Sequence, residues 1–276
     1  MTKEMNFNMT RWIIFVLVAL AIIIPVIIRD KIKLPDTSSK VVKNIYDHME
    51  ALPANSPIVL SIDFDPSSEE ELRPITIAVL RHAFRKNLRV IGMTIGGPSS
   101  YGTMSDIFSK TSKELNKQEG VDFAIMPYKP GFSSVILNIS QDIFFTYPED
   151  HKGNKTKELL VLKGIKSLKD MKYAMCISAG NAVDTWIIFG KEKGKMPLGA
   201  GCTGVMATDY YPYLQSGQLL GLVGGLGAAS QYEALINQRG TATESMKPQT
   251  VVHSLIIMLI IIGNVVYFLS RKKPKI

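Results

Sequence analysis

The chain has 276 residues, a formal net charge of +8 and two cysteines, and 46% of its residues are hydrophobic. This length suits one domain with additional segments. Part of the positive charge lies beside apolar segments at the two ends of the chain. The remainder is spread along the sequence and forms no block of basic and aromatic residues. Nucleic-acid-binding proteins concentrate such residues in a patch, so we expect no nucleic-acid partner.

Two apolar segments, one near each end of the chain, are long enough to cross a membrane. Residues 12–28 carry no charge, and residues 251–269 are interrupted only by His253, Ser254 and Asn264. A transmembrane helix needs about 17–25 mostly apolar residues. The sequence after the first segment has no cleavage site with small residues, which favours an uncleaved anchor over a signal peptide. We therefore predict two transmembrane helices in contact with the lipid bilayer.

These segments divide the chain into parts that we expect to behave differently. We predict a cytoplasmic tail (1–11), a transmembrane helix (12–28), a stalk with a short helix (29–56), a soluble domain (57–240), a linker (241–250), a second transmembrane helix (251–269) and a basic tail (270–276). Both tails are basic, and Glu4 is the acidic residue that they contain. Basic tails favour a cytoplasmic location for both. Arg29, Lys31 and Lys33 favour the opposite orientation, but long domains translocate largely regardless of charge. We predict an extracytoplasmic domain.

The segment between the apolar ends alternates β-branched runs with helical patterns. The runs predict strands at 58–62, 88–95, 121–126, 173–177 and 203–207, and the patterns predict helices at 69–86, 101–118 and 133–145. Such alternation implies right-handed crossovers and a mostly parallel sheet. We predict an α/β fold: a single Rossmann-like domain inserted between two transmembrane helices. Cys176 and Cys202 lie among small apolar residues, which suits buried thiols, although one disulfide is also compatible with their number.

Polar residues and glycines follow each predicted strand. Ligands bind beyond the carboxyl ends of the strands in open α/β sheets, so these residues are candidates for a ligand site. The candidates are Ser67, Gly96, Gly97, Lys129, Ser178, Asp209, Gly224 and Gly225. The last two belong to a glycine-rich run that precedes a predicted helix at 228–237, where backbone N–H groups could bind an anion. Close packing of the backbone explains these glycines equally well.

An Asp63-x-Asp65-x-Ser67 motif directly follows the first predicted strand. Two carboxylates at this spacing can hold Mg²⁺, with one acid as nucleophile and the other as general acid or base. The motif resembles the first motif of haloacid-dehalogenase-type phosphohydrolases. That resemblance implies Asp63 and Asp65 as catalytic and metal-binding residues. Those enzymes usually have Thr or Val in place of Ser67. They also need a later pair of acidic residues after another strand, and this chain supplies one such acid, Asp209. The alternative is a turn and a helix cap, with Ser67 or Ser68 preceding three glutamates.

Two functional hypotheses follow from these patterns. The first is a membrane-anchored α/β binding or scaffold protein, a subunit of a membrane-associated assembly with itself or with other membrane proteins. Anchoring at both ends raises the effective concentration at the bilayer, which favours assembly. The second is a membrane-tethered, metal-dependent hydrolase that uses Asp63, Asp65 and Mg²⁺. The first hypothesis names no cofactor. A Cys176–His82 catalytic pair has no support, because no pattern places these residues together.

Overall fold

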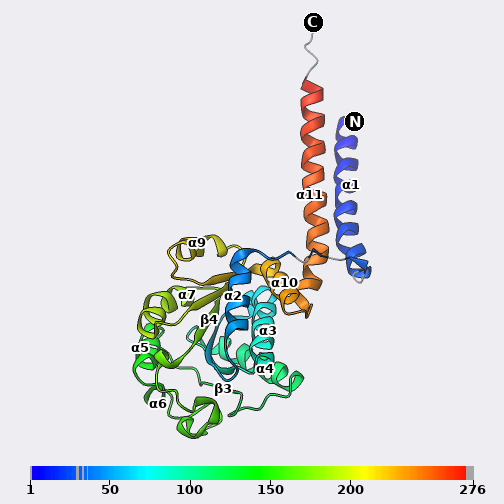
Figure 1. Cartoon of the computed structure of the whole chain (residues 1–276). Coiled ribbons are helices and arrows are strands. Elements are labelled where there is room, and N and C mark those ends of the chain that lie inside the picture. Colours follow the sequence, from blue (N-terminus) through cyan, green and yellow to red (C-terminus); the bar gives the residue numbers. More distant parts are fainter. Residues whose placement is uncertain (1, 29–30, 33, 36, 272–276) are drawn as a thin grey trace. The chain divides into compact units, whose positions relative to one another are not determined.

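The computed structural model describes residues 2–28, 31–32, 34–35 and 37–271 (Figure 1). Contacts divide the chain into two compact units. One contains the terminal segments, Met1–Pro35 and Thr243–Ile276, and the other is Asp36–Ala242. The second unit, called the domain below, contains the sheet, and the two units are described separately.

The domain contains a six-stranded sheet in which every pair of neighbouring strands is parallel. The strands are β1 (Pro57–Asp63), β2 (Arg89–Met93), β3 (Phe123–Ile125), β4 (Tyr173–Ser178), β5 (Leu198–Cys202) and β6 (Gly221–Gly224). Their order is β3-β2-β1-β4-β5-β6, so the direction of winding reverses between β1 and β4. All seven residues of β1 are buried, as expected for a central strand covered on both faces. The predicted Rossmann-like α/β fold is confirmed.

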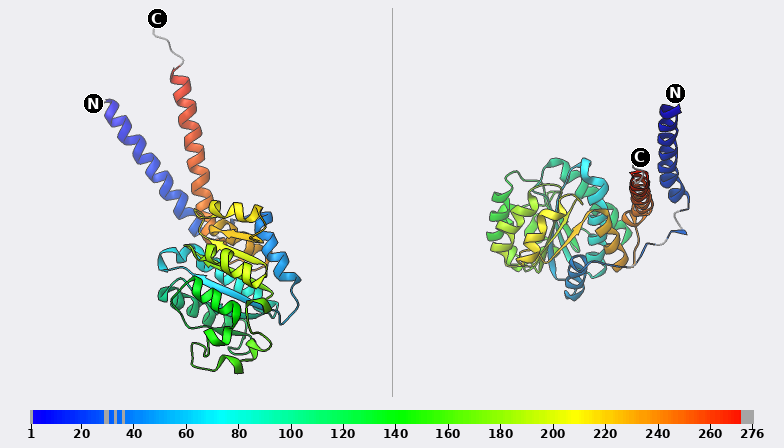
Figure 2. Two further views of the ribbon diagram at one scale, coloured as in Figure 1. Left: turned by 90° about the vertical axis from the view of Figure 1, so that its left-hand side faces the viewer. Right: turned by 90° about the horizontal axis from the view of Figure 1, so that it is seen from above.

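Helices cover both faces of the sheet (Figure 2). One apolar core includes α2 (Lys40–Ala51), α3 (Glu69–Arg85), α4 (Pro98–Glu114) and α10 (Gly225–Leu235). The other includes α5 (Ser133–Gln141), α6 (Ile143–Thr146), α7 (Ala182–Thr185) with its π-helical continuation (Trp186–Lys191), and α9 (Ala207–Gln215). The remaining elements are α8 (Glu192–Gly194) and 3₁₀ turns at Pro66–Ser68, Thr156–Glu158, Leu160–Leu162 and Leu168–Asp170.

The fifth predicted strand is wrong, and the sixth strand was not predicted. Residues 203–207 form a turn and the start of α9, whereas β5 ends at Cys202. Both β5 and β6 contain glycines, which lack the bulky side chains typical of strands. Neighbouring groups fill the space instead: an ideal Cβ on Gly199 would lie 1.9 Å from Tyr173 Oη, and one on Gly221 would lie 2.4 Å from the Val41 carbonyl oxygen.

Helix α2 lies in a region that the sequence suggested was a stalk, but it packs within the domain. Val42, Ile45 and Met49 form an apolar stripe and are fully buried. The Asn44 side-chain amide donates to the carbonyl oxygen of Leu220, at 3.2 Å, directly before β6. The buried apolar stripe and this hydrogen bond make α2 part of the core of the domain.

Two long apolar helices occupy the ends of the chain: α1 (Thr2–Ile27) and α11 (Thr241–Arg271). Their most apolar windows have mean hydropathies of 2.5 and 2.4, and only 6% and 0% of these windows are buried. The core helix of a soluble protein would instead be mostly buried. Both helices are therefore long and apolar enough to span a membrane. Helix α11 also includes residues 241–250, for which a linker was expected.

Candidate ligand site at the strand ends

A cavity of about 290 Å³ lies where β1, β2 and β4 end, beside the point at which the winding of the sheet reverses. In open α/β sheets this is the usual position of a ligand. Five residues singled out from the sequence line it: Asp63, Asp65, Ser67, Gly96 and Ser178. Its other lining residues are Phe64, Ser68, Ser99, Ser100, Phe132, Ala179, Gly180, Asn181 and Ala182.

Asp63 ends β1, and its side chain joins this strand to β2. Its Oδ1 atom accepts hydrogen bonds from Thr94 Oγ1 at 3.0 Å, Ile95 N at 2.6 Å and Gly96 N at 2.8 Å. Two of these donors are backbone N–H groups directly after β2. They would have no partner if the carboxylate were removed, and a buried, unpaired N–H group is costly.

The second oxygen of Asp63 faces the strand itself and β4. Ser61 Oγ donates to Oδ2 at 2.5 Å, and the Cys176 thiol donates to the same atom at 3.5 Å. Burial raises the pKa of Asp63 above its ordinary value, while the hydrogen bonds from Ser61 and the backbone oppose this shift. Asp63 is thus a buried hub that holds three strand ends together.

Asp65 has a different environment, although it also lines the cavity. It is exposed, and its Oδ1 atom accepts bonds from Ser67 N at 3.0 Å and Ser67 Oγ at 2.6 Å. The bond from the Ser67 hydroxyl lowers the pKa of Asp65. These contacts cap the turn that leads into α3, so the cap is Asp65. The structure gives Ser68 no side-chain capping bond at the start of α3.

Five other sequence candidates do not line this cavity. Lys129 lies with its Nζ atom 5.8 Å from the centre of the Tyr147 ring, and Asp209 is exposed in the first turn of α9. Gly224 ends β6 and Gly225 begins α10, where the glycines allow close packing: an ideal Cβ on Gly225 would lie 2.9 Å from Gly204 Cα. Gly225 also has a φ of +69°, which favours glycine. Gly97 precedes α4 beside the cavity but is not among its lining residues.

The acidic residues form no cluster around the Asp63-x-Asp65 motif. Within the described part of the chain, no group of three or more His, Cys, Asp or Glu side chains could hold a metal ion. Asp209 belongs to α9, away from the lining of the cavity. The later acidic pair of the phosphohydrolases therefore has no counterpart among the residues that surround Asp63.

Both cysteines are buried free thiols, which decides between the two states left open by the sequence. Burial raises the pKa of both thiols, that of Cys202 to about 12. His82 is not paired with Cys176. Its ring nitrogens instead lie 2.7 Å from Tyr232 Oη and 2.9 Å from Glu50 Oε1, and burial lowers the pKa of its imidazole. Buried thiols with a raised pKa stay protonated, so Cys176 and Cys202 are packing groups rather than activated nucleophiles.

The cavity also contains residues that were not chosen from the sequence. Ser99 and Ser100 belong to the first turn of α4, and the residue before this helix, Gly97, has no side chain that could cap it. Gly180 and Asn181 follow β4. All four come after strands, so the strand-end rule could have selected them. Phe132 lies in the loop before α5, and no sequence signal connects it with this site.

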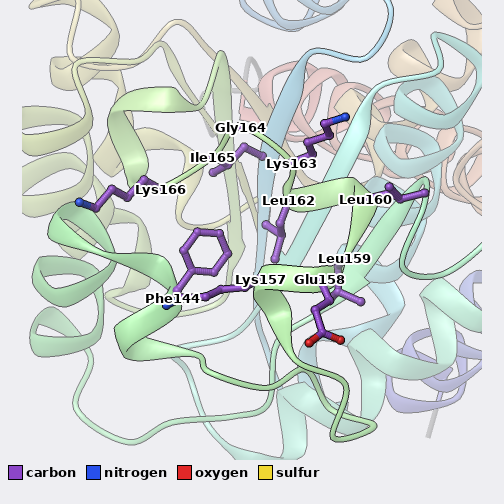
Figure 3. A pocket seen from close by; sticks show the side chains of 10 residues that line it. All are labelled: Phe144, Lys157, Glu158, Leu159, Leu160, Leu162, Lys163, Gly164, Ile165 and Lys166. Carbon is purple, nitrogen blue, oxygen red and sulfur yellow. The ribbon is translucent and has the colours of Figure 1, made fainter.

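A larger hollow of about 560 Å³ lies elsewhere in the domain and has different chemistry (Figure 3). It is lined by Phe144 and by residues of the segment 157–166, which contribute three leucines, three lysines, Glu158, Gly164 and Ile165. Arg89 fixes this segment by donating to the carbonyl oxygens of Val161 and Lys163, at 3.0 and 2.7 Å. No residue of the Asp63 cavity contributes to it.

Comparisons with known proteins assign no family to the chain. No protein-family model and no curated protein matches it. Among solved structures, the N-terminal domain of Candida albicans trehalose-6-phosphate phosphatase is similar over 79% of this chain, with 12% sequence identity and a TM-score of 0.28. The chain covers 46% of the length of that structure. A similarity this low assigns neither fold nor function, and the fold follows from the sheet order alone.

Proposed function

We propose that this chain is a membrane-anchored binding protein, a subunit of a membrane-associated assembly, whose domain binds a small, neutral, hydroxyl-rich ligand. One observation carries the proposal: a cavity of about 290 Å³ at the carboxyl ends of β1, β2 and β4 has a lining dominated by hydroxyl and amide groups. Its size is close to the lower limit for pockets that bind small molecules.

The lining indicates the class of ligand. Five serines (Ser67, Ser68, Ser99, Ser100 and Ser178) and Asn181 contribute donors and acceptors. Among the described residues that form the lining, none is Lys, Arg or His, whereas two are aspartates. An anionic ligand would meet these carboxylates without a compensating cation. A neutral molecule with several hydroxyl groups matches the lining better.

The environment of Asp63 favours binding over hydrolysis. Both of its oxygens already accept hydrogen bonds from inside the domain, and Asp65 caps a turn. Mg²⁺ needs oxygen ligands arranged in a nearly octahedral geometry, usually with several waters. Using Asp63 as such a ligand would break bonds that hold the strand ends together. The metal-dependent hydrolase therefore remains the second hypothesis.

The ligand site is tested by filling the cavity. Gly180 lines it, and an ideal Cβ at this position contacts nothing within 4 Å, so Gly180→Trp places an indole in the cavity without a backbone clash. We expect full-length protein in nanodiscs to bind glucose or myo-inositol with a Kd on the order of 1 mM. The substitution should weaken this binding at least about tenfold, as measured by ligand-observed NMR.

Gly102→Trp is the matched control, because Gly102 also has open space around its Cβ and lies outside the cavity. Binding that is equal in both variants would contradict the site. A separate titration with Mg²⁺ examines the second hypothesis: a rise in Tm that Asp63→Asn abolishes would favour the hydrolase. Isolation of the protein as a monomer without partners would contradict the assembly.

We also propose that α1 and α11 both cross the membrane, with the tails in the cytoplasm and the domain outside. The basic tails support this orientation. Lys155→Cys provides a label site, since the Lys155 side chain is 74% exposed, whereas both native thiols are buried. A membrane-impermeant maleimide should label this variant in intact cells and leave the parent protein unlabelled. Labelling only after permeabilisation would reverse the orientation.

A further inference from the structure

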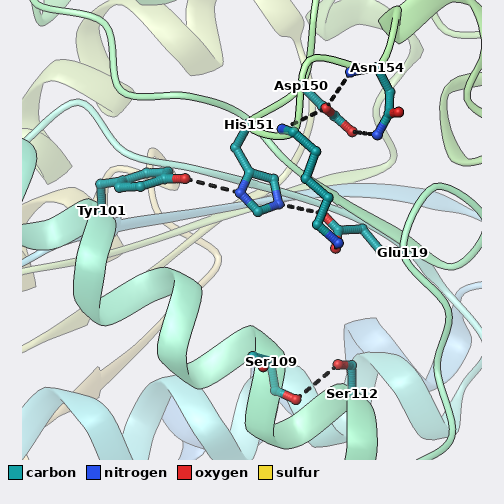
Figure 4. Close-up of polar contacts among 8 residues, drawn as sticks. Tyr101, Ser109, Ser112, Glu119, Asp150, His151 and Asn154 are labelled. Atoms are coloured by element: carbon teal, nitrogen blue, oxygen red, sulfur yellow. Dashed lines mark hydrogen bonds and ion pairs between the residues drawn. The ribbon is translucent and has the colours of Figure 1, made fainter.

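A third cavity, separate from the strand-end site, lies between α4 and the loop that carries His151. Its volume is about 380 Å³, and it shares no lining residue with the cavity beside Asp63. Figure 4 shows its polar groups: the serines of α4 lie on one side, and His151 and Glu119 lie on the other. The functional hypotheses derived from the strand ends leave this cavity without a role.

The charge of its lining is predominantly positive. The lining contains three ammonium groups, from Lys113, Lys117 and Lys152, and one carboxylate, from Glu119. Glu119 is already neutralised, because His151 Nε2 and Lys152 Nζ both lie 2.5 Å from its carboxylate oxygens. Lys113, which is exposed, has no hydrogen bond or ion pair through its ammonium group among the described residues. This arrangement leaves positive charge available to a ligand.

The walls of the cavity are held in place before any ligand binds. Asp150 accepts hydrogen bonds from Lys152 N at 2.8 Å and Asn154 N at 2.9 Å, which fixes the loop. Because a carboxylate can only accept, His151 Nε2 carries the proton donated to Glu119, and Nδ1 lies 3.0 Å from the Tyr101 hydroxyl, which donates to it when the imidazole is neutral. A preorganised site loses little entropy when it binds a ligand.

The floor of the cavity is apolar and one wall carries hydroxyl groups. Phe123 and Ile125 belong to β3 and are 3% and 2% exposed, so only the edges of these side chains reach the cavity. Ser109 and Ser112 line the cavity from α4, and the Ser112 hydroxyl donates to the Ser109 carbonyl oxygen at 3.2 Å. The combination of an apolar floor with ammonium groups at the rim matches an amphiphilic molecule with an anionic end.

We propose that this cavity binds a small organic anion. Its apolar or planar part would contact the exposed edges of Phe123 and Ile125, and its carboxylate or phosphate would contact Lys113 and Lys117. Lys117 already donates to Asn87 Oδ1 at 2.6 Å and lies 3.6 Å from Asp122 Oδ1, so its ammonium group is held at the rim and its charge is partly compensated. Lys113 supplies the uncommitted charge, so the affinity depends on it more than on any other lysine of the cavity.

The test uses full-length protein in nanodiscs and ¹⁹F NMR titrations with 4-fluorophenyl phosphate, 4-fluorobenzoate and the neutral 4-fluorobenzyl alcohol. We expect at least one anion to bind with a Kd on the order of 1 mM and the alcohol to bind at least about tenfold more weakly. The comparison of the two anions distinguishes phosphate from carboxylate. Lys113→Gln should weaken the binding of the anion about tenfold, because it removes a charge-assisted hydrogen bond.

Lys110→Gln is the matched control, since Lys110 lies one turn earlier on α4, is paired with Asp106 at 2.9 Å and does not line the cavity. It should bind the anion as the parent protein does. The proposal is overturned if neither anion binds more tightly than the alcohol, or if Lys113→Gln and Lys110→Gln bind equally. Gly180→Trp should leave binding of the anion unchanged, which separates this site from the strand-end cavity.

Discussion

Replacement of Asp63 by alanine is expected to lower the free energy of unfolding by about 3–5 kcal/mol. The substitution removes the acceptor of the Ile95 and Gly96 N–H groups and of three side-chain donors, all in a buried region. Each buried donor left without a partner costs about 1–3 kcal/mol, although hydroxyl groups can rotate towards other acceptors. Urea unfolding, followed by Trp186 fluorescence in a Trp12→Phe background, measures the loss, because Trp186 is fully buried.

Asp63→Asn is the control for this prediction. Its amide oxygen can accept the three bonds from the β2 side, and its NH₂ group can donate to Ser61 Oγ and Cys176 Sγ, so we expect a loss of about 1 kcal/mol or less. Because the pKa of Asp63 is raised in the folded state, stability should decrease as the pH rises from the ordinary value through the raised one. Asn should remove that decrease. Equal losses for Ala and Asn would contradict the role of Asp63 as an acceptor.

Replacement of Gly221 by alanine is expected to cost about 2–3 kcal/mol, because it forces α2 away from β6. An ideal Cβ at this position would lie 2.4 Å from the Val41 carbonyl oxygen and 2.7 Å from Ile45 Cγ1. The first of these is a backbone atom of α2, whose apolar stripe is buried against the domain, and it cannot move aside as the end of a side chain can. The same unfolding measurement applies, and proteolysis of the α2 segment should become faster.

Gly102→Ala is the matched control, because an added Cβ in the exposed middle of α4 meets nothing within 4 Å. This substitution should stabilise the protein by about 0.5–1 kcal/mol through helix propensity. If Gly221→Ala were as mild as this control, α2 would not be packed against β6. The two variants thus compare the same chemical change in a crowded and in an open environment.

The sequence predicted the centre of the sheet better than its β6 edge. Ile58–Val59–Leu60 and the run before Cys176 are buried on both faces, and such strands consist of β-branched and apolar residues. Strands β5 and β6 were not predicted, because they contain glycines where strands usually have bulky residues. Side chains from other segments occupy the space beside these glycines, Tyr173 at Gly199 and Ile45 at Gly221. This complementarity exists only between segments far apart in the chain.

The site was predictable in position but not in the orientation of its groups. The strand-end rule selected Asp63, Gly96 and Ser178, which do share one cavity. It could not show that the Asp63 carboxylate is occupied, because all its donors except Ser61 come from the segment after β2 and from β4, up to 113 residues away. Lys129 also follows a strand, yet it lies against Tyr147 and outside the cavity. Sequence position specifies which loop a residue joins, whereas side-chain direction depends on packing.

The contact of α2 with the last elements of the domain has a consequence for biosynthesis. Ser39 N donates to Gln231 Oε1 at 2.8 Å, across a separation of 192 residues. At about 5–20 residues per second, the ribosome needs about 10–40 s to synthesise the chain between these partners. During this interval the apolar stripe of α2 has no strand to cover it, so the first helix of the domain is among the last to be packed. Nascent chains should therefore require protection by chaperones until β6 and α10 have left the ribosome.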